Sequence, residues 1–159
     1  MGIKVDVSKL EEFQRKLKQL NTVQKDLFLR ETTMEMGNRL LSLVIPRTPV
    51  GSYPKGSGKV GGTLRRGWNI NGGQAVPLAM VEKTVGGYTL TLTNSTPYAS
   101  YVEQGHRQTP GRYVPAIGKK LKANWVEGQH FLQISELELQ NVAPGILQAR
   151  LDAFLRSVF

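Results

Sequence analysis

The residues of this chain most able to do chemistry are its two histidines and a glutamate close to one of them. His106 and His130 lie far apart in the sequence, and neither has a carboxylate or a second histidine at the short spacing typical of a metal site. Glu103 is near enough to His106 to suggest an acid–base pair. A glutamate at the end of a short helix, however, more often accepts hydrogen bonds from nearby backbone or from an arginine. We therefore predict no catalytic residue and no metal site.

The glycine-rich segments do not form a recognisable phosphate site either. The chain contains no G-x-x-x-x-G-K-S/T motif, and Lys55–Lys59 resembles a phosphate cradle only superficially, because no helix begins there to supply aligned N–H groups. No serine lies in a nucleophile-elbow pattern. The sequence therefore favours a protein that is not an enzyme and needs no cofactor.

The net charge of +9 is concentrated in two segments without acidic residues, 46–68 and 104–126. Elsewhere basic and acidic residues nearly balance. Such segments suit contact with phosphate or with an acidic protein, and the alternative is that they only aid solubility. The partner-binding candidates in them are Lys55, Lys59, Arg65, Arg66, Arg107, Arg112, Lys119, Lys120 and Lys122.

Length and composition narrow the class of protein. With 159 residues, the chain is expected to form one domain over residues 1–159, with a flexible Gly/Pro-rich loop at 46–62. The absence of cysteine excludes disulfides and thiolate metal sites and is compatible with a reducing compartment. No apolar run approaches the roughly 20 residues needed to span a bilayer, and the N-terminus lacks a signal-peptide core. We expect a soluble protein, made in a cytoplasm, without membrane contact.

Two long helices should position the charged segments. A capping box at Ser8–Glu11 and a repeating apolar stripe predict a helix from Ser8 to Val44, stopped by Pro46, with a break near Asn21-Thr22. A second helical region is predicted from Gln129 to Phe159, broken or kinked at Pro144. Its apolar stripe, which must be covered by the core or by a neighbouring subunit, consists of Ile146, Leu147, Leu151, Phe154, Leu155 and Val158.

Between these helices the pattern favours β-structure and one short helix. Ala79–Val85 and Tyr88–Asn94 flank Gly86-Gly87 and predict a hairpin, with Asn94–Thr96 as its exit turn. The other expected elements are a strand within Thr63–Asn71, a short helix over Tyr98–Gln104 ended by Gly105, and extended segments at Tyr113–Pro115 and Ala123–Val126. The predicted fold class is α+β, with a small antiparallel sheet and its hairpin packed against the long N-terminal helix and a C-terminal helix.

The order of several motifs resembles the tail-completion or head-tail joining proteins of long-tailed bacteriophages. In that family a long helix, here Ser8–Val44, ends at T-P-V, which matches Thr48–Val50. A G-x-L-R follows at Gly62–Arg65, and Y-A-x-Y-V-E-x-G matches Tyr98–Gly105. Trp125–Phe131 lies where the relatives enter the C-terminal helix. The chain departs from the pattern in one place, because residues 51–61 separate two motifs that are normally almost adjacent.

The resemblance implies a structural virion protein. It implies an α+β subunit of a ring, for which we expect a hexamer, at the neck of the particle, where the tail is completed or joined to the head. Its partners would be further copies of itself, neighbouring neck, connector and tail proteins, and DNA passing through the ring. For the basic segments we favour acidic protein over DNA, since a lumen that gripped phosphate strongly would hinder DNA exit. The alternative function is a nucleic-acid-binding module acting outside a virion, which the charge and the aromatics near the basic segments would suit.

Overall fold

The structure is a computed structural model that describes residue 15 and residues 22–53, 56, 58, 60–68, 81–115 and 118–158. Its helices are α2 (Thr22–Arg47), α3 (Thr63–Arg66), α4 (Ala99–Gln104) and α5 (Phe131–Val158). Its strands are β1 (Glu82–Thr84), β2 (Gly87–Thr89), β3 (Gly105–Arg107), β4 (Tyr113–Val114), β5 (Lys119–Lys120) and β6 (Trp125–Glu127). The predicted α+β class is confirmed.

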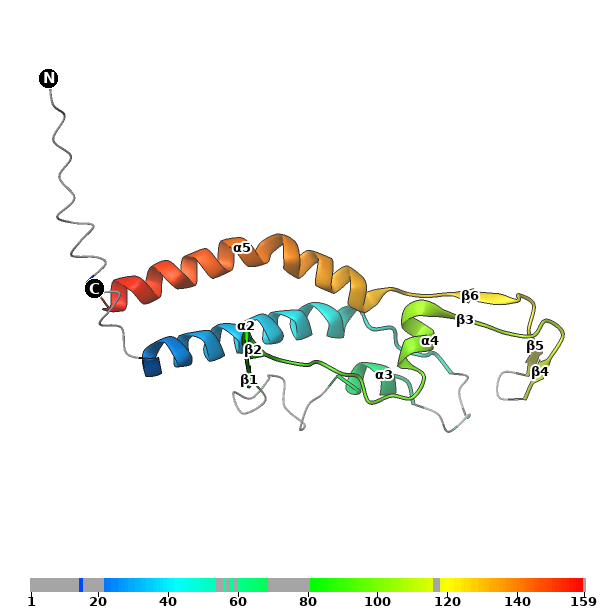
Figure 1. The fold of residues 1–159 in the computed structure, drawn as a ribbon. Coiled ribbons are helices and arrows are strands. Elements are labelled where there is room, and N and C mark those ends of the chain that lie inside the picture. Colours follow the sequence, from blue (N-terminus) through cyan, green and yellow to red (C-terminus); the bar gives the residue numbers. More distant parts are fainter. Residues whose placement is uncertain are drawn as a thin grey trace, which may run out of the picture.

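The two long helices, α2 and α5, run antiparallel and side by side (Figure 1). The last turns of α5 lie next to the first turns of α2, and the small elements α3 and α4 gather at the other end of the pair (Figure 1). The buried residues of α2 include Gly37, Leu41 and Val44, which recur every three or four positions and so share one side of the helix. This side of α2 faces the interior.

The C-terminal end of α2 and the start of α5 lie close to their predicted positions. α2 ends at Arg47, one residue beyond Pro46, whereas the predicted start at Ser8 and the break near Asn21-Thr22 concern residues at or beyond the edge of the described part of the chain. Pro144 does not break α5, which is continuous, but the helix axis bends near its middle (Figure 1). A proline removes one intrahelical hydrogen bond and crowds the preceding turn, which accounts for a bend in a helix that otherwise continues.

The hydrophobic core lies where α2, α3 and the start of α5 meet. Its buried members are Leu41, Val44, Leu64, Trp68 and Phe131. The indole of Trp68 meets the ring of Phe131 edge to face, with centroids 6.3 Å apart, a favourable geometry for two aromatic rings. The core therefore joins the last turns of α2, residues 64–68 and the start of α5.

The predicted hairpin is confirmed as β1–β2, with its turn shifted by one residue. Thr84 pairs with Gly87, so the two turn residues are Val85 and Gly86 instead of Gly86-Gly87. The hairpin lies against α2 (Figure 1), where Lys83 donates a hydrogen bond to Asp26 at 2.5 Å. This ion pair raises the pKa of Lys83 and lowers that of Asp26.

The strand predicted within Thr63–Asn71 is wrong for its first residues, which form the short helix α3. Gly62 has a φ of +91°, a left-handed conformation that glycine adopts without strain, and it turns the chain into the helix. The N–H of Arg66 then donates to the carbonyl of Gly62 at 2.9 Å. Asn69–Asn71 lie outside the described residues.

The described residues within Gly105–Glu127, which are 105–115 and 118–127, form a projecting antiparallel ribbon, the β-arm, which extends beyond the helices (Figure 1). Its inner ladder is β3–β6 and its outer ladder is β4–β5. Tyr113–Val114 and Trp125–Glu127 confirm the extended segments predicted around Tyr113 and Ala123–Val126.

A bulge separates the two ladders of the β-arm. Gly111 N–H donates to the Leu121 carbonyl at 2.8 Å, and Leu121 N–H donates to the Arg112 carbonyl at 2.9 Å, so two residues of one strand oppose one of the other. Gly111 has a φ of +83°, as the glycine of a G1 bulge requires, and follows Pro110 in a tight turn. The outer ladder is turned away from the line of the inner one (Figure 1).

Candidate interaction surfaces

The T-P-V segment forms a buried joint with α3. Thr48 is fully buried, and its hydroxyl donates to the carbonyl of Val44 at 2.8 Å while accepting the indole N–H of Trp68, also at 2.8 Å. One threonine thus satisfies both the end of α2 and a buried tryptophan donor. The motif has a structural role at this position.

Arg65, the arginine of G-x-L-R, belongs to the same joint. Its guanidinium donates to the carbonyl of Thr48 at 2.8 and 3.1 Å and to that of Pro46 at 3.1 Å. These carbonyls lie at the C-terminal end of α2, where the helix leaves acceptors unpaired and where positive charge is favourable. Arg65 is therefore engaged within its own chain, and its contact with a partner stays a prediction.

The insertion at residues 51–61 leaves this joint intact because its ends meet. A Cβ atom on Gly61 would lie 2.2 Å from the carbonyl oxygen of Gly51, so the two backbones are in direct contact. The intervening chain can therefore vary without moving T-P-V away from G-x-L-R. This explains how two motifs separated in sequence still act as neighbours.

The segment after the hairpin also secures α3. The side chain of Asn94 donates to the carbonyl of Leu64 at 2.8 Å and accepts from the N–H of Thr96 at 3.0 Å, which confirms the predicted exit turn. Gly67 packs so closely that a Cβ there would lie 2.2 Å from the Asn94 side-chain oxygen. The exit turn is thus fixed against α3.

Glu103 caps α5 from a distant part of the chain. Its two carboxylate oxygens accept from the N–H groups of Leu132 and Gln133, at 3.0 and 3.1 Å, in the first turn of α5. A carboxylate at a helix N-terminus pairs free donors and interacts favourably with the helix dipole. The expectation that Glu103 accepts hydrogen bonds from backbone is confirmed.

The glycine that ends Y-A-x-Y-V-E-x-G allows the β-arm to leave the body. Gly105 has a φ of +86°, and a Cβ there would lie 2.5 Å from the carbonyl oxygen of Val126. Across the ribbon, a Cβ on Gly128 would lie 2.2 Å from the carbonyl of Glu103. The chain therefore requires glycine where it enters the β-arm, at Gly105, and just after it leaves the β-arm, at Gly128.

The histidines are placed in separate surroundings. His106 lies on β3 beside the ring of Tyr101, with centroids 5.7 Å apart, while His130 precedes α5 with a φ of +49°. Within the described ranges no group of three or more histidine or acidic side chains could hold a metal ion. Glu103 is occupied by α5, so the imagined acid–base pair with His106 has no support in the geometry.

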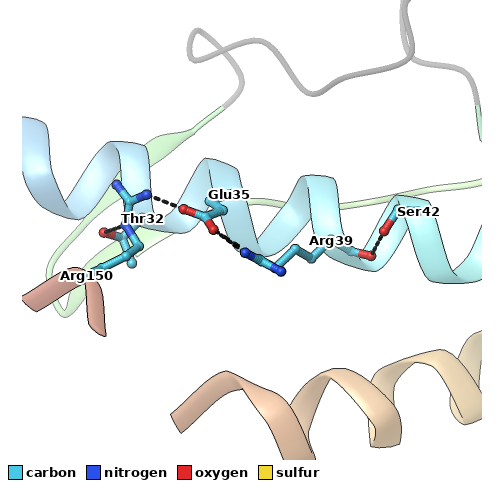
Figure 2. A network of polar contacts seen from close by, with 5 residues as sticks. All are labelled: Thr32, Glu35, Arg39, Ser42 and Arg150. Carbon is cyan, nitrogen blue, oxygen red and sulfur yellow. Dashed lines mark hydrogen bonds and ion pairs between the residues drawn. The ribbon is translucent and has the colours of Figure 1, made fainter. Parts of the chain in front are cut away.

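A chain of polar contacts joins α5 to α2 (Figure 2). Arg150 donates to the hydroxyl of Thr32 at 3.1 Å and pairs with Glu35, which also binds Arg39 one turn along α2. The hydrogen bond from Arg39 is the main reason that the pKa of Glu35 lies below its ordinary value; Arg150 adds to the effect and partial burial opposes it. This cluster fixes the pairing of the helices away from the aromatic core.

The second basic segment is the β-arm itself. Its five predicted partner-binding residues are all exposed: Arg107, Arg112, Lys119, Lys120 and Lys122. Tyr113 and Trp125 on the same ribbon retain 55% and 41% of their accessible surface. The structure thus places these five residues on one projecting ribbon. The sequence had predicted only a loop with short extended segments there.

The structure describes only part of the first basic segment, residues 46–68. Arg66 is exposed and donates to the carbonyl of Gly61 at 3.2 Å. Lys55 and Lys59 lie outside the described residues.

The apolar stripe of α5 is only partly covered within the described chain. Phe154 stacks on Phe28 of α2, with centroids 4.5 Å apart, but Leu147 and Leu151 remain 41% and 40% exposed. Of the two expected covers for this stripe, the core and a neighbouring subunit, the core of the described chain does not cover Leu147 and Leu151, and cover by a neighbouring subunit stays a prediction.

Taken together, the geometry defines an α+β structural module with a firmly joined body and an exposed basic arm. The chain belongs to the HK97 gp10-like family, whose model, described as "Bacteriophage HK97-gp10, putative tail-component", matches residues 11–105. The protein is thus a bacteriophage tail component and a part of the virion. The match ends at Gly105, where the β-arm begins.

The remaining comparisons add no further relative. No curated protein and no solved structure matches the chain. Among the described residues, no helix is both long and apolar enough to cross a membrane.

Proposed function

We propose that this protein forms a ring at the neck of a tailed bacteriophage particle, where it completes the tail or joins it to the head. The observation that carries the proposal is the family match over residues 11–105, together with the ordered motifs that build the joint between α2, α3 and α5. The protein acts by binding neighbours and is not an enzyme.

The shape of the subunit suits a ring. The helical body provides a rigid unit, and the β-arm reaches beyond it (Figure 1). In the described part of the chain every sheet has only two strands, which leaves strand edges available to pair with another chain. Ring closure also requires that one surface meets a different surface of the next copy, and an elongated subunit with unlike ends offers two such surfaces.

The partners in this proposal are neighbouring copies, for which we expect six in the ring, and the adjacent neck, connector and tail proteins. The purified protein is expected to be mainly monomeric, because ordering of glycine-rich loops opposes association until a partner surface is present. Light scattering at micromolar concentration measures this directly. A stable ring in isolation would contradict the expected assembly order.

Loss of the gene tests the proposed function. A phage that lacks the protein should accumulate filled heads and separate tails, and addition of purified protein to that lysate should restore infectious particles. Protein carrying Thr93→Val, a change on an exposed side chain, serves as a matched control for handling. Normal yields of finished particles without the protein would refute a role in joining.

The exposed cations of the β-arm also suit the alternative, a nucleic-acid-binding module outside the virion. Mass spectrometry of purified particles separates the two functions. A fixed number of copies per particle supports the virion role, whereas absence from particles and presence on host nucleic acid would support the alternative.

A further inference from the structure

We propose that the β-arm binds the phosphate backbone of double-stranded DNA, through cations on both of its faces. The biological setting of this inference, DNA passing through the neck, rests on the proposed function. The binding itself follows from the charge and geometry of residues Gly105–Glu127.

The cations of the β-arm differ from those of the helical body in their pairing. Ion pairs with acidic residues hold Arg39, Arg47, Lys83 and Arg150. In the described chain, no ion pair involves the five cations of the β-arm, and all five are exposed. Part of the positive charge outside the β-arm is thus neutralised within the chain, whereas all five cations of the β-arm are available to a partner that supplies negative charge.

The register of the outer ladder places these charges on opposite faces. Lys120 pairs with Tyr113 and Lys119 with Val114, and consecutive residues of a strand point to opposite sides. Lys119 and Lys120 therefore extend from the two faces of a ribbon only two strands wide. A flat acidic protein surface would contact only one of these faces and would leave the cation on the other face unpaired.

A groove of duplex DNA provides phosphate on both sides of an inserted element. The major groove, about 12 Å wide, admits a two-stranded β-ribbon, and its two walls are the phosphate backbones. Tyr113 is exposed and lies on the same face as Lys120, and its hydroxyl is a further donor of the kind that contacts phosphate. The charge pattern of the β-arm thus fits duplex DNA better than it fits a single protein surface.

Binding of this kind is compatible with movement of the DNA. Contacts from exposed lysines to phosphate carry no base preference, are weakened by salt, and allow a protein to slide along the duplex. A ring of such arms would centre the DNA without holding one position. This removes the objection that a positively charged lumen must obstruct DNA exit.

Fluorescence anisotropy with a labelled duplex of about 25 base pairs tests the inference, with the full-length protein at about 50 mM and about 200 mM salt. The arm variant is Lys119→Gln, Lys120→Gln and Lys122→Gln. The control variant is Arg15→Gln, Lys25→Gln and Arg156→Gln, which removes the same number of charges from exposed positions outside the β-arm. Thermal melts verify that both variants remain folded.

We expect the arm variant to bind roughly tenfold or more weakly at the lower salt, with the slope of log affinity against log salt reduced by about 2 to 3, while the control stays within about threefold of wild type. Equal losses in the two variants would overturn the inference, since the total charge would then account for binding. Absence of binding by the wild type at the lower salt would also overturn it.

The head–tail joining assay separates this inference from the proposed function. If the wild-type protein binds DNA through the β-arm but does not restore head–tail joining, the inference stands and the proposed function is rejected. Restored joining by a protein that does not bind DNA would do the reverse. An arm variant that binds DNA normally but fails to join heads to tails would overturn the inference and assign the β-arm to an acidic protein.

Discussion

The hydrogen bond between Thr48 and Trp68 allows the buried joint to be tested by one substitution of nearly unchanged side-chain shape. Thr48→Val replaces the hydroxyl by a methyl group of similar size and so leaves the packing nearly unchanged. The carbonyl of Val44 keeps a partner, because the backbone N–H of Thr48 also donates to it at 2.9 Å. The group left without a partner is the indole N–H of Trp68, a residue only 4% exposed.

The expected cost follows from that one donor. A buried N–H without a partner destabilises a protein by about 1–3 kcal/mol. For a domain of this size each kcal/mol lowers the melting temperature by roughly 2–4 °C, so Thr48→Val should melt about 2–12 °C below wild type. Thr93→Val, on an exposed threonine, should change the stability by less than about 0.5 kcal/mol.

A double-mutant cycle isolates the bond. Trp68→Phe removes the donor but also shortens the ring that meets Phe131, so its own cost includes lost packing. In the Thr48→Val background the additional loss from Trp68→Phe should be smaller by about 0.5–3 kcal/mol, measured by chemical denaturation. Strict additivity of the two changes, or a Thr48→Val protein as stable as wild type, would refute the assigned contact.

Three further outcomes follow from the structure. Gly128→Ala should yield unfolded or insoluble protein, because its Cβ would lie 2.2 Å from a carbonyl oxygen of α4, whereas Gly86→Ala, with open space around it, should stay soluble in the same expression test. Phe154→Asp should lower the melting temperature markedly, because it loses the stack on α2, while Leu151→Asp, at a position 40% exposed, should have little effect; equal effects would contradict this packing. Because the pKa of Glu35 is lowered in the folded state, its carboxylate stabilises the protein above its ordinary pKa of 4.5, and this stabilisation is lost as the pH falls through the folded-state pKa. Between about pH 6 and about pH 3 the wild type should therefore lose more stability than Glu35→Gln. Parallel pH profiles of the two proteins would argue against the ion pair.

Sequence patterns were most informative where the signal is local. The end of α2 at Pro46–Arg47, the short helix before Gly105 and the exit turn at Asn94 all depend on residues within a few positions of one another. Glu103 was also expected to accept hydrogen bonds from backbone, but the sequence did not show that the donors lie in the first turn of α5. Proline, glycine and asparagine act on their own stretch of backbone, so their effects can be read directly.

The incorrect predictions concern residues whose structure depends on contacts with distant parts of the chain. A strand was predicted within Thr63–Asn71, but Gly62 starts a helical turn at Thr63–Arg66, and Leu64 is buried in the core with Leu41 and Val44 of α2. In α5 the apolar stripe is wider than the area that α2 covers, so the sequence did not distinguish Leu151 from Phe154. Tertiary contacts override local preference in both cases.

The β-arm was only partly predicted, although its turn signals are present. Pro110-Gly111 marks the bulge, and the turn from Pro115 to Gly118 closes the ribbon with a hydrogen bond of 3.2 Å. Because the paired strands are short and separated by the bulge, neither shows the alternation that identifies a longer strand. Two nearby turn signals within a basic, acid-free segment would have been sufficient to suggest a hairpin.

An image reconstruction of the neck in the intact particle tests the proposed ring. We expect a closed ring of this protein between the tail tube and the head, with α2 and α5 in the wall of the ring and the β-arms directed toward the DNA. Density for the protein at the distal end of the tail, or a neck fully built from other chains, would contradict it.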